Sequence, residues 1–159
     1  MMIKIFLCGW NSPAVTELSN FQSEGKMDVE TVVCGGSVSP SQIVDAFERG
    51  CDGVCLITCS QNECHYRLGV ETASKIASVV SDILRISGIG DERFRIEQLR
   101  SDQAKNISKI LSEWIRSIES LQPLTRKEVK LEGLPKIEER VRHLSEELNV
   151  LYCLECGKC

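Results

Sequence analysis

The stretch Gly53-Val54-Cys55-Leu56-Ile57-Thr58-Cys59 decides the fold of this chain. It is almost continuously apolar over the length of one strand, which is typical of a parallel strand buried on both faces. Apolar runs at residues 3–8 and 29–34 precede it, and a short alternating run at residues 94–99 follows it. Helical patterns separate these four runs, and strands joined by helices favour right-handed crossovers between parallel strands.

The helical patterns are found at residues 14–21, 40–49 and 68–86, and after Ser101. The second of them has the clearest boundaries. Ser39, Pro40 and Gln42 form a capping-box start, and Gly50 provides a left-handed exit at the other end. We therefore expect an α/β fold: a small open parallel sheet of about four strands, in the order 2-1-3-4, with helices on both faces.

The character of the chain changes near Pro123, so we predict an α/β domain over residues 1–123 and a tail over residues 124–159. The tail is rich in both acidic and basic residues, and a helix with a thin apolar seam is expected from Pro135. It closes with Cys153, Cys156 and Cys159, in the order Cys-x-x-Cys-x-x-Cys. This is the opening of a bacterial ferredoxin ligand run, which predicts part of a [4Fe-4S] site whose fourth ligand comes from elsewhere.

Composition restricts the classes of function. The chain of 159 residues has 42% hydrophobic and 26% charged residues, which is ordinary for a globular protein. A net charge of −4 and a pI near 5.3 give no electrostatic footprint for nucleic acid or an anionic membrane. The nine cysteines are odd in number, and no secretory pattern is recognised, so we expect reduced thiols in a cytoplasmic protein.

Four cysteines carry the functional prediction. Cys8, Cys34 and Cys59 each close an apolar run, and Cys64 lies in the next loop. Because the carboxyl ends of parallel strands form one edge of the sheet, these thiols should converge there. Soft thiolates bind iron in clusters, and the four would complete the shell of a [2Fe-2S] centre. Cys55 lies about 13 Å from Cys59 along an extended strand, so we interpret it as structural.

Several segments resemble the delta subunit of methyl-viologen-reducing hydrogenase over roughly residues 3–123. They are Cys8-Gly9-Trp10, Cys34-Gly35-Gly36-Ser37-Val38, Gly50-Cys51-Asp52-Gly53-Val54, and Cys59 to Cys64-His65-Tyr66. The resemblance implies an iron-sulfur subunit with a [2Fe-2S] cluster. It also implies electron transfer from a hydrogenase or formate dehydrogenase to the flavin-containing subunit of heterodisulfide reductase, in a complex that can bifurcate electrons.

The chain departs from that family pattern at two places. Asn11 occupies a position where the family usually has a further cysteine, and Gln61-Asn62-Glu63 replaces a Pro-Gly-Asp stretch. The cysteines that still match the family are Cys8, Cys34, Cys59 and Cys64, and these are the ligands that the resemblance implies. The tail is similar to the first half of the ferredoxin motif in the C subunit of heterodisulfide reductase.

Two other functions stay open from the residues alone. The same thiols could form a zinc-stabilised interaction module, or a thiol redox protein with a reactive pair in the tail. We find no constellation at catalytic spacing, since the histidines are only His65 and His143, and we predict no catalytic residues. We expect His65 to support the cluster sulfur atoms, Trp10 to be a hydrophobic shield, and Cys51 to have no metal role.

Overall fold

A computed structural model describes residues 1–21, 27–122 and 124. It contains a sheet of four parallel strands, β1 (Ile3–Cys8), β2 (Met27–Val32), β3 (Gly53–Cys59) and β4 (Phe94–Leu99), in the order β2-β1-β3-β4. The predicted α/β class and strand order are therefore confirmed. The helix expected from Pro135 and the cysteines of the tail lie outside the described residues.

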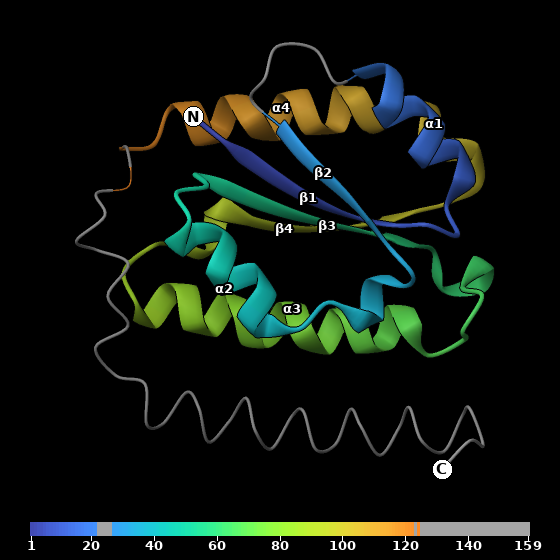
Figure 1. Cartoon of the computed structure of the whole chain (residues 1–159), viewed down its shortest axis with the longest axis horizontal. Coiled ribbons are helices and arrows are strands. Elements are labelled where there is room, and N and C mark those ends of the chain that lie inside the picture. Colours follow the sequence, from blue (N-terminus) through green and yellow to red (C-terminus); the bar gives the residue numbers. More distant parts are fainter. Residues whose placement is uncertain (22–26, 123, 125–159) are drawn as a thin grey trace.

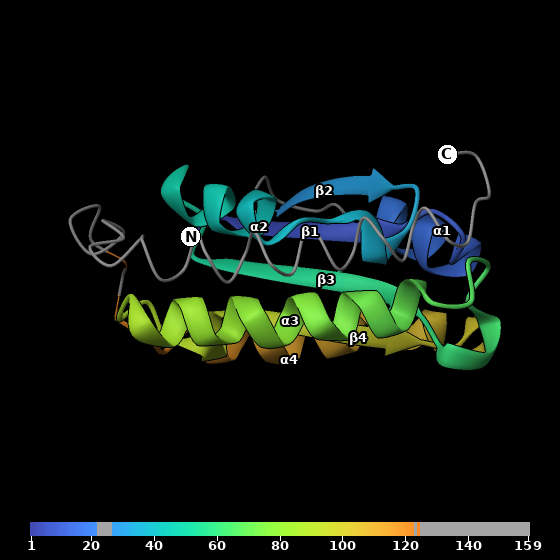
Figure 2. The same cartoon turned by 90° about the horizontal axis from the view of Figure 1, so that it is seen from below.

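Four α-helices cover the two faces of this sheet (Figure 1). They are α1 (Ser12–Phe21), α2 (Pro40–Glu48), α3 (Gly69–Ile86) and α4 (Ile107–Glu119). Helices α1 and α4 pack on one face, and α2 and α3 lie beside each other on the other face, as the view from below also shows (Figure 2). No helix in the described part of the chain is long and apolar enough to cross a membrane.

Strand β3 is the centre of the core, since all seven of its residues are buried. Its side chains alternate between the two faces. Val54 and Leu56 join the cluster under α2 and α3, whereas Cys55 and Ile57 join the cluster under α1 and α4. Because apolar burial is the main favourable contribution to folding, this strand fixes the position of both layers, and its carboxyl end is held rigidly.

The connection into α2 follows the sequence prediction closely. The Ser39 hydroxyl accepts a hydrogen bond from the Gln42 amide, and the Gln42 side chain accepts one from the Ser39 amide, so the capping box is present. Gly50 ends the helical segment with φ of +96°, a conformation that favours glycine. The chain then enters β3 directly.

The start of the last helix differs from the prediction. Residues Ser101–Asn106 form a 3-10 helix, and α4 begins at Ile107. The amide and the hydroxyl of Ser101 both donate to the Glu63 carboxylate, at 2.8 and 2.9 Å. A carboxylate is a stronger acceptor than a neutral group, and this pair ties the loop after β3 to the loop after β4.

Candidate metal centre

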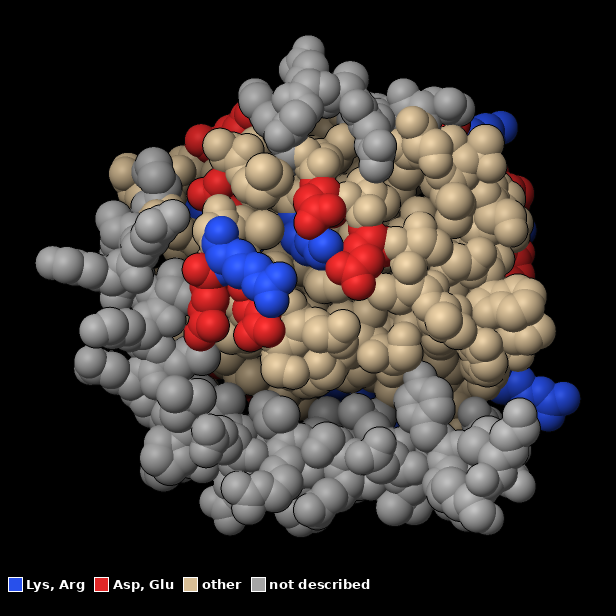
Figure 3. Space-filling view, viewed as in Figure 1, with Lys and Arg blue, Asp and Glu red and all other residues tan. Residues whose placement is uncertain are grey.

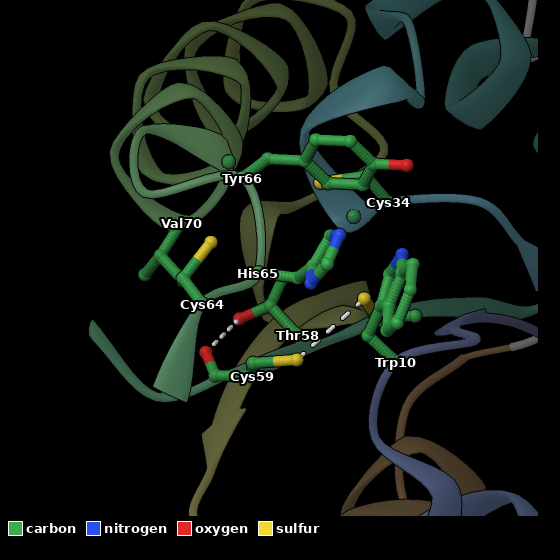
Figure 4. Close-up of a pocket in the computed structure, with 11 residues that line it drawn as sticks. Trp10, Cys34, Thr58, Cys59, Cys64, His65, Tyr66 and Val70 are labelled. Atoms are coloured by element: carbon green, nitrogen blue, oxygen red, sulfur yellow. Dashed lines mark hydrogen bonds between the residues drawn. The ribbon is translucent and has the colours of Figure 1, made fainter. Parts of the chain in front are cut away.

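The four cysteines from the apolar runs meet at the carboxyl edge of the sheet. Cys8 is the last residue of β1 and Cys59 the last residue of β3, while Cys34 lies two residues beyond the end of β2. Cys64 follows the short 3-10 helix Gln61–Glu63. All four line one pocket, and Figure 4 shows Cys34, Cys59 and Cys64 around it. The first three are buried, and Cys64 is partly exposed.

The sulfur positions suit metal-binding chemistry. The Sγ atoms of Cys8 and Cys59 are 3.7 Å apart. Two thiolates on one tetrahedral ion, with metal–sulfur bonds of about 2.3 Å, would lie about 3.8 Å apart, so this pair has the spacing of two ligands to the same metal. Within residues 1–21, 27–122 and 124, no three His, Cys, Asp or Glu side chains are gathered around a single ion position.

The backbone around the pocket stabilises negative charge on one of these sulfurs. Cys8 Sγ accepts hydrogen bonds from the Cys34 thiol and from the amides of Trp10 and Gly35, and these lower the pKa of Cys8 to about 5 despite its burial. The pKa of Cys34 is raised because its thiol donates to Cys8 and because it is buried. Burial and the negative charge on Cys8 raise the pKa of Cys59 to about 12. One thiolate is thus already favoured before any cation binds.

Three aromatic side chains form the exposed wall of the pocket. Trp10 stacks on His65 with ring centroids 3.5 Å apart and planes 10° apart, and Tyr66 meets the His65 ring edge-on at 5.0 Å (Figure 4). Trp10 is 50% exposed and Tyr66 38% exposed, whereas the remaining wall is largely buried. Trp10 therefore covers the pocket, as a shield would, but it also pairs with His65, which the sequence does not predict.

The cavity between the sulfurs and this wall is small. It measures about 10 Å³, roughly the space of one water molecule. The donor set fits an iron-sulfur group, because soft thiolates converge in a dry pocket where a backbone amide network supports one of them.

Asn11, which occupies the position where the resemblance implies a further cysteine, has a structural role. Its side chain is 2% exposed and does not line the pocket. The amide nitrogen Nδ2 donates to the Leu99 carbonyl at 3.1 Å, and Oδ1 accepts from the Ala14 amide at 3.4 Å near the start of α1. The Leu99 carbonyl also accepts from the Ser60 amide at 3.0 Å. Asn11 thus helps to join the loops after β1, β3 and β4.

The other described cysteines lie away from the pocket. Cys55 is fully buried under α1 and α4, and Cys51 lines a separate groove beside β2 and α2. Charged side chains gather at this groove (Figure 3): Lys4, Asp28, Glu30, Asp45 and Arg49. Neither Cys51 nor Cys55 lines the pocket that Cys8, Cys34, Cys59 and Cys64 share. Cys153, Cys156 and Cys159 lie outside the described residues.

The chain is thus a small α/β domain with an open parallel sheet and a site of four cysteine thiols at the carboxyl edge of that sheet. The family profile described as "Methyl-viologen-reducing hydrogenase, delta subunit" matches residues 3–122. This chain therefore belongs to that family, as the resemblance implies.

Two groups of curated relatives match this chain. It is 27% identical, over 73% of its length and 87% of the relative's, to the iron-sulfur D subunit of the F420-non-reducing hydrogenase of Archaeoglobus profundus. A similar protein of Methanococcus voltae, the iron-sulfur D subunit of the F420-non-reducing hydrogenase vhc, is 26% identical over 77% of this chain and 88% of the relative. These relatives are named iron-sulfur subunits, which supports an iron-sulfur cofactor in general terms.

The other group consists of much longer proteins. The A subunit of the Ferredoxin/F420H2-dependent CoB-CoM heterodisulfide reductase of Methanosarcina acetivorans is 26% identical over 86% of this chain. The chain spans only 18% of the length of that relative. Because 86% of this chain is more than residues 3–122, this match extends past the family region into the tail.

Proposed function

We propose that this chain is an electron-transfer subunit in which Cys8, Cys34, Cys59 and Cys64 hold a [2Fe-2S] cluster. The observation that carries the proposal is the convergence of these four thiols in one pocket, two of them 3.7 Å apart. The cluster would supply one-electron transfer, because iron held by thiolates is stable in two oxidation states. The chain's own contribution is to hold the thiolates, to exclude water and to supply amide hydrogen bonds to sulfur.

The proposed partners are a hydrogenase or formate dehydrogenase module as donor and, as acceptor, a flavin-containing protein similar to the heterodisulfide reductase subunit. Support comes from the relatives, which carry the names of a hydrogenase D subunit and a heterodisulfide reductase A subunit. In Methanosarcina acetivorans a region similar to this chain is part of the heterodisulfide reductase polypeptide. When a domain is fused to a protein in one organism, a separate copy of that domain in another organism is a reasonable binding partner for the corresponding protein there. Electron bifurcation would take place at the partner's flavin.

The aromatic wall supports transfer to a partner at one side of the molecule. Trp10, His65 and Tyr66 separate the thiols from solvent, and they are the exposed members of the pocket lining. Val33, which directly precedes Cys34, is 69% exposed at the same edge. Apolar exposed side chains next to a redox centre suit a contact surface between proteins, since they exclude water when a partner docks. We therefore propose that donor and acceptor approach at this edge.

For the tail, we propose that Cys153, Cys156 and Cys159 contribute three ligands to a second cluster, of the [4Fe-4S] type, with the fourth ligand supplied from outside these 159 residues. The spacing of the ferredoxin ligand run supports this assignment. The match to the heterodisulfide reductase A subunit, which extends beyond residue 122, is consistent with a link between the tail and that kind of protein.

The first experiment is an absorption spectrum of the anaerobically purified chain, with iron and zinc counted and the EPR spectrum recorded after reduction. We expect about two iron atoms per chain and a reduced [2Fe-2S] signal. Cys34→Ser should abolish or strongly change that signal, and Cys51→Ala should leave it intact. A colourless protein with one zinc would instead establish the zinc module. A metal-free protein with a reactive tail disulfide would establish the thiol redox protein.

A further inference from the structure

We propose that the four thiols act as two pairs, Cys8 with Cys59 and Cys34 with Cys64, and that Gly69 is the positioning residue that lets the second pair close. The inference rests on the proposed function, because a two-iron centre gives each iron two protein ligands. It goes further by assigning which cysteines share an iron and by giving a role to a residue that binds nothing itself.

The first pair is buried at the carboxyl ends of two neighbouring strands. Cys8 and Cys59 close the neighbouring strands β1 and β3, both side chains are at most 4% exposed, and their sulfurs are 3.7 Å apart. This spacing equals that of two thiolates on one tetrahedral ion, about 3.8 Å. Both residues are held by strands of the rigid core, so this half of the site is formed by the sheet itself.

The second pair comes from loops that reach the first residue of α3. A Cβ atom placed on Gly69 would lie 2.5 Å from Cys34 Sγ and 3.2 Å from Cys64 Sγ. The two sulfurs are therefore no further apart than the sum of these distances. Both lie beside the Gly69 backbone, at the place that a side chain would occupy. The loop that carries Cys34 is equally close, since a Cβ on Gly36 would lie 2.6 Å from the Gly69 carbonyl oxygen. A side chain at position 69 would separate the two sulfurs or push them apart from the site.

The N-terminus of α3 gives this second pair an electrostatic advantage. Helix α3 has 18 residues, and the positive end of its dipole lies at Gly69, beside the two sulfurs. The first pair has a different support, since Cys8 Sγ accepts from the amides of Trp10 and Gly35.

The connectivity of the sulfurs favours this pairing over the alternative. Cys59 contacts Cys8, and Cys34 and Cys64 share Gly69, so each proposed pair consists of two residues that meet in the structure. Pairing Cys8 with Cys34 would instead leave Cys59 and Cys64 to share the other iron, and in the described part of the chain the Cys59 thiol is hydrogen-bonded to Cys8 and not to Cys64.

Four single serine variants of the full chain test the pairing by EPR of the dithionite-reduced protein. A serine oxygen changes the ligand field of the one iron it binds, so two variants on the same iron should give matching shifts in g values. We expect Cys8→Ser to match Cys59→Ser, and Cys34→Ser to match Cys64→Ser. If Cys8→Ser matches Cys34→Ser instead, the pairing is wrong. Absence of iron and of an EPR signal in the unsubstituted chain would overturn the proposed function itself.

The Gly69→Ala variant tests the positioning role without replacing a cysteine ligand. Its methyl group would meet two sulfurs, so we expect g shifts of the Cys34→Ser and Cys64→Ser type and iron release to a chelator faster by on the order of 10-fold. Gly53→Ala is the matched control, because its Cβ would lie 2.4 Å from Ile118 Cδ1, equally crowded but in the core. That variant should lose stability and keep the spectrum. A Gly69→Ala protein with the original g values and iron release rate would refute the role of Gly69.

Discussion

Cys55 and Cys59 lie on the same buried strand, β3, yet their surroundings differ. Cys55 is fully buried among apolar side chains under α1 and α4, and burial raises the pKa of its thiol strongly. Cys59 lies at the carboxyl end, where its sulfur meets that of Cys8 and faces the pocket. One residue type thus serves as core filler in the middle of a strand and as a candidate ligand at its end. Position along the strand decides between the two.

The largest expected effect is the loss of the centre when the edge cysteine is removed. Cys59→Ala should reduce the iron content from about two atoms per chain to nearly zero, because one iron loses a thiolate. Cys55→Ala should keep the iron and the visible spectrum, since its sulfur lies outside the pocket. Iron analysis of both proteins after anaerobic purification makes the comparison. Equal iron loss in the two variants would mean that the middle and the end of β3 are not functionally distinct.

A substitution in the middle of β3 should lower the free energy of unfolding. Cys55→Ser places a hydroxyl among apolar groups, which costs about 1–3 kcal/mol when no hydrogen-bond partner is present. Cys51→Ser is the control, because Cys51 is 8% exposed and borders an open groove with charged side chains, whereas Cys55 is 0% exposed. Denaturant unfolding of the iron-loaded proteins should show the larger loss for Cys55→Ser, with unchanged iron in both. A larger loss for Cys51→Ser would contradict the assignment of Cys55 to the core.

The sequence predicts the sheet and the meeting of the thiols because both follow from long-range rules. A strand buried on both faces has a continuous apolar pattern, and parallel strands bring their carboxyl ends to one edge. These rules place Cys8 and Cys59 without any knowledge of the loops. The strand order is obtained in the same way, from the pattern of strands and intervening helices.

The details between the strands could not be predicted, because they depend on loop conformations. The stacking of Trp10 on His65 requires the loops after β1 and β3 to meet, and neither loop has a periodic pattern. The bonds from Ser101 to Glu63 join two loops that are distant in sequence, and no local pattern predicts such a contact. The role of Gly69 at two sulfurs is likewise invisible in a residue that simply begins a helical pattern. One sign was available, since Trp10 and His65 both lie close in sequence to a candidate ligand.

The smallest effect in the isolated chain is expected for the second group of cysteines. The edge thiols come from the ends of two strands and from two loops of the folded domain, whereas Cys153, Cys156 and Cys159 come from one short stretch of sequence. Three thiolates leave one iron of a [4Fe-4S] cluster without a protein sulfur ligand, so this cluster should be labile until a fourth ligand is supplied. Replacing all three by alanine should therefore leave the [2Fe-2S] signal and most of the iron of the isolated chain unchanged.

The same triple variant should behave differently in the complete complex with its partner proteins. There the unsubstituted chain should gain about four further iron atoms and a [4Fe-4S] signal, and the variant should gain neither. Iron analysis and EPR of both proteins, alone and in the complex, measure the difference, and Cys51→Ala is the control for the loss of a cysteine that is not a ligand. A stoichiometric four-iron cluster in the isolated chain would refute the external ligand. Unchanged iron in the complex of the triple variant would refute the second cluster, and the edge of the sheet would then be the sole iron site of this chain.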